Sequence, residues 1–202
     1  MKITHPNISA KNHPSQEGIY QGVKFKTKYI NEIAPQHPKI KILKKWCKIF
    51  HEKNLAPPYS GGSFGNLSFR IESGKNKFII TGSRIGMKNS LTNDSFVEVI
   101  SCDLEKKIVS VKGTREPSSE AMLHFAIYQE FPEINAIFHG HRFLQNFPVT
   151  LKEEAYGTIE LVNEALKTLL GNKIINMKNH GFISIGVNMD EAGKNVLMDF
   201  SK

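Results

Sequence analysis

Residues 96–112 read FVEVISCDLEKKIVSVK, two strand-like runs on either side of the short connection Asp103-Leu104-Glu105-Lys106. Valine and isoleucine dominate both runs, and apolar and polar residues largely alternate, which is typical of strands with one buried face. Parallel strands need a crossover of a dozen or more residues, whereas antiparallel strands are joined by short turns. This stretch therefore predicts an antiparallel hairpin and favours an antiparallel sheet.

The rest of the sequence extends this pattern. Further strands are predicted at 67–71, 77–81, 134–139, 173–177 and 182–185. Helices are predicted at about 38–54, 118–131, 158–170 and 190–200. Since amphipathic helices cover sheets, we expect an α+β fold, a three-layer α/β/α sandwich with a central, mainly antiparallel sheet flanked by helices. We expect one domain over 38–202, preceded by a partly irregular N-terminal arm over 1–37.

Composition restricts the class of protein. The 202 residues carry a net charge of +8, but the lysines are scattered. The densest basic stretch, 39–46, has apolar residues at helical spacing, so its lysines are predicted to be a solvated face; we expect no nucleic-acid partner. No run of 18 apolar residues occurs, which predicts no membrane contact. The only cysteines, Cys47 and Cys102, are not in a CxxC pair, and we expect reduced thiols in a cytoplasmic protein.

Three motifs bring one carboxylate and three imidazoles: Pro117-Ser118-Ser119-Glu120, His139-Gly140-His141 and Asn179-His180-Gly181. Side chains at i and i+2 of a strand share a face, so His139 and His141 project together if the strand reaches position 141. His180 lies in the predicted turn between two strands. Each histidine alone is more readily explained as an ordinary histidine whose ring is satisfied by hydrogen bonds, and the His-x-His pair alone fits either explanation about equally. Together with Glu120, they are typical of a catalytic zinc site with an open position.

The same region predicts an anion site. Ser118 or Ser119 can cap the helix that starts there, and the N–H groups of a helix start bind anions. The alternative is a plain cap with an acid that offsets the helix dipole. Because this helix leads into the His-x-His strand, Glu120 becomes a candidate proton-transfer group. Gly65-Asn66 and Thr81-Gly82 are routine turns alone, but with the two serines they form three donor sets that suit a phosphate monoester.

Six motifs follow one another along the chain: Gly65-Asn66-Leu67-Ser68-Phe69-Arg70, Thr81-Gly82, Leu91-Thr92, Pro117-Ser118-Ser119-Glu120-Ala121-Met122-Leu123-His124, His139-Gly140-His141 and Asn179-His180-Gly181. In this order they resemble the class II aldolase/adducin family, over roughly residues 38–200. The best-known enzymes of that family are aldolases of fuculose 1-phosphate and rhamnulose 1-phosphate. The resemblance implies an α/β/α fold, one zinc per chain and a four-fold homotetramer.

The resemblance also implies a role for each motif residue. The zinc ligands would be His139, His141 and His180, and Glu120 would be the catalytic acid/base, which also touches the metal when no substrate is bound. The phosphate of a small sugar phosphate would bind Gly65, Asn66, Thr81, Gly82, Ser118 and Ser119. His124 is not a ligand in the family and is treated as structural. The implied reaction is reversible retro-aldol cleavage of a ketose 1-phosphate, such as L-fuculose 1-phosphate, to dihydroxyacetone phosphate and an aldehyde through a metal-stabilised enediolate.

The sequence departs from the family pattern in ways that leave the substrate open. His141 and His180 are 39 positions apart, fewer than is general in the family, and Arg142-Phe143 follows His141 instead of small residues. A sugar-phosphate 4-epimerase usually has aspartate where Glu120 stands. A methylthioribulose-1-phosphate dehydratase uses the same three histidines and a glutamate, and remains an alternative. A non-catalytic, adducin-like binding module is the alternative of another class, although such modules tend to lose the ligands.

Overall fold

A computed structural model describes residues 21–198 of the chain. In this part of the chain one eight-stranded sheet runs in the order β1-β7-β6-β5-β4-β8-β10-β9. Its strands are β1 (Lys26–Asn31), β4 (Asn66–Arg70), β5 (Phe78–Thr81), β6 (Phe96–Asp103), β7 (Ile108–Lys112), β8 (Ala136–Gly140), β9 (Ile174–Met177) and β10 (Gly181–Gly186). The short strands β2 (Pro58–Tyr59) and β3 (Gly62–Ser63) pair with each other.

The sheet is mainly antiparallel, as predicted. The β6–β7 hairpin forms where the sequence indicated it, with a register shift between Val99 and Ser101. Every other neighbouring pair is also antiparallel except β1 with β7, which is parallel. The centre of the sheet is therefore antiparallel, and β8 lies between β4 and β10.

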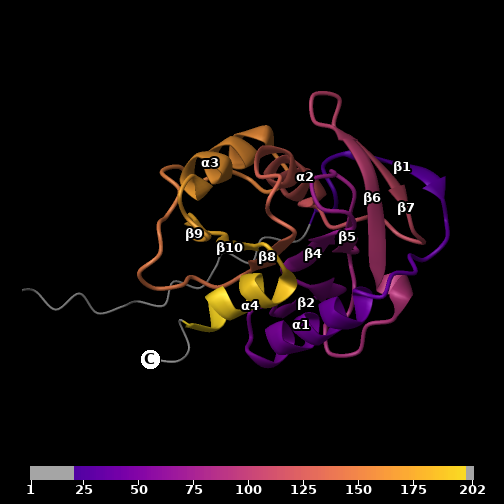
Figure 1. Cartoon of the computed structure of the whole chain (residues 1–202), viewed down its shortest axis with the longest axis horizontal. Helices are drawn as coiled ribbons and strands as arrows, with labels where there is room; N and C mark the ends of the chain where they lie inside the picture. The colour runs from indigo at the N-terminus through magenta and orange to yellow at the C-terminus, as the bar shows by residue number, and fades with distance from the viewer. Residues whose placement is uncertain (1–20, 199–202) are drawn as a thin grey trace, which may run out of the picture.

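Helices cover both faces of the sheet, which confirms the three-layer prediction. They are α1 (Ile40–Glu52), α2 (Ala121–Glu130), α3 (Ile159–Leu169) and α4 (Met189–Leu197). Figure 1 shows α1 and α4 together on one side of the sheet and α2 and α3 on the other. The alternation of strand residues divides the core accordingly: in β5, Phe78 and Ile80 pack toward α2 and α3, and Ile79 packs toward α1 and α4.

The helix α2 is more buried than its sequence pattern indicated. The spacing of Met122, Phe125 and Ala126 is typical of a helix with one apolar stripe, but every residue from Ala121 to Tyr128 is buried. The helix packs against both β6 and α3, so no side of its first two turns faces solvent. Its first residue, Ala121, directly follows Glu120 at the N-cap position, which places that carboxylate at the end of a rigid element.

The strand β1 was not predicted. It lies within the arm expected over 1–37, of which residues 1–20 lie outside the described residues, as does the end of the helix expected over 190–200. The stretch KTKYIN has weak alternation, and its pairing with β7 joins segments about eighty positions apart along the chain, which local sequence does not encode. No helix of residues 21–198 is both long and apolar enough to cross a membrane.

Candidate metal centre and adjoining cavity

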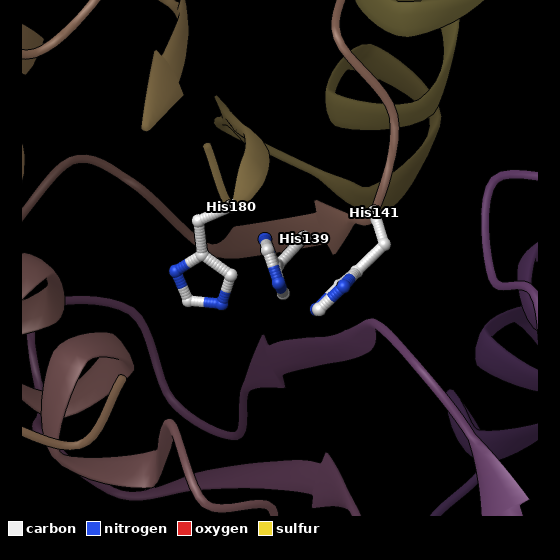
Figure 2. A group of neighbouring side chains, drawn as sticks. All are labelled: His139, His141 and His180. Carbon is white, nitrogen blue, oxygen red and sulfur yellow. The ribbon is translucent and has the colours of Figure 1, made fainter. Parts of the chain in front are cut away.

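The structure brings the three motif histidines together. Each of His139, His141 and His180 offers a ring nitrogen, and these three atoms lie within 4.8 Å of one another. Figure 2 shows the imidazoles side by side on the same side of β8. His139 belongs to β8, His141 follows its last residue, and His180 lies in the turn between β9 and β10. The strand ends one residue before His141, but the imidazole still turns toward the same point.

Two glycines allow this close assembly. A Cβ on Gly140 would lie 2.5 Å from the ring of Phe182 and 2.8 Å from the carbonyl oxygen of Leu55. Gly181 has a φ of +135°, and a Cβ there would collide with the carbonyl of Gly140. Side chains at either position would push β8 and the β9–β10 turn apart. The glycines next to the histidines therefore set how closely the imidazoles approach.

The carboxylate of Glu120 points into the histidine cluster. Its Oε2 lies 3.0 Å from Nε2 of His139, and its Oε1 lies 3.3 Å from Nε2 of His180. The amide of Asn66 donates a hydrogen bond of 2.7 Å to Oε2. Glu120 is only 3% exposed. The four motif side chains thus form one group, drawn from the start of α2, the end of β8 and the β9–β10 turn, in which Glu120 and His139 are buried and His141 and His180 are partly buried.

Two of the three imidazoles are in the form that binds a metal. Burial lowers the pKa of His180 to about 4 and holds the pKa of His141 well below its ordinary value. Burial raises the pKa of Glu120, but its interactions with the neighbouring imidazoles, His139 first, outweigh burial and hold that pKa well below its ordinary value. At neutral pH, His141 and His180 are therefore neutral and Glu120 is ionised. Metal ligands must be deprotonated in this way.

The hydrogen bonds of His139 leave a nitrogen that a cation fits. Its Nδ1 lies 2.7 Å from the carbonyl oxygen of Phe182, which can only accept, so Nδ1 carries a proton and Nε2 is the nitrogen that faces the carboxylate of Glu120. Within residues 21–198, His139 Nε2, Glu120 Oε1 and His180 Nδ1 are buried without a hydrogen-bond partner. A cation bound between His139 and Glu120 would satisfy Nε2 and Oε1, and the Phe182 carbonyl is the kind of partner that orients a ligating imidazole.

A cavity of about 420 Å³ adjoins the histidines. Glu120, His141 and His180 line it, together with five of the six residues predicted to bind phosphate: Gly65, Asn66, Gly82, Ser118 and Ser119. Thr81 is the sixth, and it lies behind the lining. It is fully buried, its hydroxyl accepts from the N–H of Leu67, and its carbonyl accepts from the N–H of Ser118.

The predicted backbone donors largely have protein partners. The N–H of Gly82 donates to the carbonyl of Ser95 at 2.8 Å, and the N–H of Ser118 donates to that of Thr81 at 3.1 Å. Ser118 Oγ in turn accepts from the N–H of Glu120 at 3.4 Å. The serine hydroxyls, which can rotate to donate, are therefore better placed to bind an anion than the N–H groups that the sequence favoured.

Several lining residues were missed by the sequence analysis. Lys24, from the predicted arm, places its ammonium 4.2 Å from the ring centre of Tyr156, and both line the cavity. The ring of Phe64 stacks on His141, with centres 4.5 Å apart and planes at 21°. No motif marks these positions, because each contact joins segments that are remote in sequence. The only sequence signal near Phe64 is the Gly65-Asn66 motif that directly follows it.

The chain is similar in sequence to a known family and to several known proteins. The sequence model of the family described as "Class II Aldolase and Adducin N-terminal domain" matches residues 43–145. An L-fuculose phosphate aldolase of Methanocaldococcus jannaschii is 28% identical over 169 residues, 73% of this chain and 84% of that protein. A methylthioribulose-1-phosphate dehydratase of Pseudoalteromonas translucida is 39% identical over 77 residues, 38% of this chain and 32% of that protein.

The fold has close solved counterparts. A solved structure of an L-fuculose 1-phosphate aldolase superposes with a TM-score of 0.65 and 26% identity, over 83% of this chain and 84% of that one. A sugar-phosphate aldolase from Thermotoga maritima gives the same TM-score at 19% identity, over 81% and 90% of the two chains, and supports the fold alone. The layered architecture predicted from the sequence is thereby confirmed.

Proposed function

Because the chain belongs to the class II aldolase and adducin family, we propose that it is a zinc-dependent aldehyde-lyase. Its substrate would be a small ketose 1-phosphate of the L-fuculose 1-phosphate kind, cleaved reversibly to dihydroxyacetone phosphate and an aldehyde. The observation that carries this proposal is the group of three imidazoles and Glu120, which opens on a cavity lined by Ser118 and Ser119. A purely structural histidine cluster would have no reason to adjoin such a cavity.

Zinc is the metal that the donor set favours. His139 Nε2 and one nitrogen each of His141 and His180 would hold it, since three neutral imidazoles with an open position are typical of catalytic zinc. When bound, the metal supplies Lewis acidity that polarises the substrate carbonyl and stabilises the negative charge developing beside it. Glu120 would join the ligands in the absence of substrate, because its oxygens already lie among the imidazoles.

The chain's own residues would carry the rest of the reaction. Asn66 holds Oε2 of Glu120, which leaves Oε1 to accept or return the proton at the carbon where the bond breaks. The hydroxyls of Ser118 and Ser119 would fix the phosphate and so align the reacting end of the substrate. Gly65 and Gly82 would allow the phosphate to approach the backbone, and Thr81 would brace Ser118 from behind through its carbonyl.

A second function is favoured by one specific observation. The match to a methylthioribulose-1-phosphate dehydratase is short, but its identity of 39% exceeds that of the longer match to the aldolase. A dehydratase would use the same metal, phosphate site and glutamate, and would break a C–O bond instead of a C–C bond. The chemistry at Glu120 is common to both reactions, so the product decides between them.

The test is to incubate zinc-loaded protein separately with L-fuculose 1-phosphate and methylthioribulose 1-phosphate. Release of an aldehyde from the first supports the aldolase, and release of a dehydrated diketone from the second supports the dehydratase. A protein that binds zinc and phosphate but turns over neither, nor any of a wider panel of ketose 1-phosphates, would contradict both. A chain that holds no zinc would favour the adducin-like binding module. The homotetramer and the cytoplasmic location stay predictions.

A further inference from the structure

A buried lysine lies beside the metal centre with no opposite charge. Lys88 is 1% exposed. Its ammonium donates to Ser63 Oγ at 2.8 Å, to the carbonyl of Phe64 at 2.9 Å and to the carbonyl of Ser63 at 3.3 Å. Within residues 21–198 no ion pair joins it to a carboxylate. All three of its protons are thus directed at two neighbouring residues.

Such a cation is costly to keep. Burial without a counter-charge disfavours the charged amine, and it lowers the pKa of Lys88 to about 8. An apolar side chain of similar length would fill the same space without this penalty. The stability of the fold therefore does not explain why a lysine occupies position 88. The explanation must lie in what Lys88 does to the segment that it holds.

The segment held by Lys88 carries the ring that positions His141. Phe64 lies between Tyr59, at 4.7 Å between ring centres, and His141, at 4.5 Å in stacked geometry. Ser63 Oγ also donates to the carbonyl of Gly86 at 2.9 Å, which ties the segment to the loop that contains Lys88. The ammonium of Lys88 is therefore connected to the imidazole of His141 by two contacts. The first joins Lys88 to Ser63 and the backbone of Phe64, and the second is the stacking of the Phe64 ring on His141.

His141 depends on that path more than the other two histidines do. Nδ1 of His139 is held by the carbonyl of Phe182, and Nε2 of His180 lies 3.3 Å from Glu120. Among the described residues, no hydrogen bond or ion pair fixes the imidazole of His141; its neighbours are rings. Ligating imidazoles are normally oriented by the hydrogen bond that their other ring N–H donates to a second residue. Here a stacked ring stands in its place.

We propose that Lys88 is a positioning residue of the metal centre: its ammonium fixes Ser63 and Phe64, and the Phe64 ring then holds His141 in the plane that faces His139 and His180. The proposal rests on the proposed function in one respect, namely that the three histidines bind zinc. It assigns no contact between Lys88 and the substrate.

The test is the zinc affinity of purified protein, measured by competition with a chromophoric chelator, so that no substrate is needed. We expect Lys88→Met and Phe64→Leu each to weaken zinc binding by at least about 10-fold, the range seen when outer partners of ligands are removed. The double variant should bind no more weakly than the weaker single variant, because both changes break one path. Ser63→Ala, which removes one acceptor, should have a smaller effect in the same direction.

A matched control separates positioning from general destabilisation. Arg70 is also 1% exposed and also donates to carbonyls, those of Ile134 and Tyr128 at 2.8 and 2.7 Å, but from the end of β4 opposite Asn66. Arg70→Met should lose thermal stability and keep its zinc affinity. Wild-type zinc affinity in Lys88→Met, or additive losses in the double variant, would overturn the proposal. If Lys88→Met does not fold, Ser63→Ala and Phe64→Leu decide in its place. Absence of zinc from the wild-type protein would instead refute the proposed function.

Discussion

The amide of Asn66 donates a hydrogen bond of 2.7 Å to Oε2 of Glu120, and so ties the first residue of β4 to the N-cap of α2. The other carboxylate oxygen, Oε1, has no hydrogen bond within residues 21–198 and points at His180. One oxygen is thus fixed and the other is available. Asn66 was predicted from the sequence as a phosphate donor; the structure shows that one of its amide protons is already engaged.

We expect Glu120→Gln to keep its fold and to lose turnover by about 100-fold or more, because the amide cannot exchange a proton with the substrate carbon. Zinc content should persist, since three imidazoles remain. Steady-state kinetics on the verified substrate, with zinc measured on the same sample, test this. Glu130→Gln, exposed at the other end of α2, is the control and should match wild type. Undiminished turnover in Glu120→Gln would remove that residue from the mechanism.

The variant Asn66→Ala should lower kcat more than it raises KM. Without the amide, the carboxylate loses the hydrogen bond that holds Oε2, and the proton transfer, not substrate binding, suffers. The comparison is with Ser119→Ala, which should raise KM through the phosphate. If Asn66→Ala raised KM and left kcat unchanged, Asn66 would be a substrate-binding residue of the kind first predicted.

Metal content is the most direct check of the histidine cluster. Elemental analysis should find about one zinc per wild-type chain, in keeping with a single three-imidazole site, and His139→Ala should lose it. His51→Ala, on α1 and outside the cluster, should retain zinc and thereby show that the loss is local. Wild-type protein that remains metal-free after zinc is supplied would refute the aldolase and the dehydratase together.

Gly140→Ala should be destabilised by about 1–3 kcal/mol, the usual cost of forcing atoms into a packed core. The new methyl group would meet the ring of Phe182 and the carbonyl of Leu55. Chemical denaturation of the metal-free protein measures the loss. Gly86→Ala, where a Cβ meets nothing within 4 Å, is the matched control and should be near neutral. Equal stability of the two variants would show that β8 and β10 can separate at little cost.

The metal-free protein should lose stability in mild acid, partly through His124. Burial lowers the pKa of this residue to about 3, against 6.5 in the unfolded chain. Between these values the unfolded state binds more protons, so stability falls as the pH drops below the unfolded pKa. His124 would contribute about 2 kcal/mol of loss between pH 7.5 and 5.

Urea unfolding at both pH values tests this. His124→Asn, which can keep a hydrogen bond to Ser68 Oγ, now 2.8 Å from Nδ1 of His124, should show a smaller loss on acidification than wild type. His51→Asn should behave as wild type. An unchanged pH dependence in His124→Asn would mean that other groups, such as His180, account for the acid sensitivity.

The features predicted from the sequence are those that short segments encode. The β6–β7 hairpin has its own turn, and the motif at 139–141 places two imidazoles by the period of a strand. The feature that completes the cluster, His180, could be predicted because its turn is flanked by two clear strands.

The features that sequence reasoning missed depend on distant partners. The engagement of Asn66 with Glu120 spans 54 positions, and the segment held by Lys88 is about 25 positions away. In α2, burial against both β6 and α3 hides the expected stripe. These features follow from packing between elements that are distant in sequence. Neither the periodicity of a segment nor a local motif predicts such packing.

The parallel strand β1 has a consequence for how the molecule behaves in crowded solution. It forms one edge of the sheet within the described residues and covers the backbone groups of β7, whose Val109 and Val111 are fully buried. Its outward residues include Lys26 and Lys28, both exposed. Without β1, the bare edge of β7 would be a template on which strands of other copies could pair. The lysines of β1 are of the kind that disfavour pairing at an open sheet edge, quite apart from any part that Lys24, two residues earlier, has in the cavity.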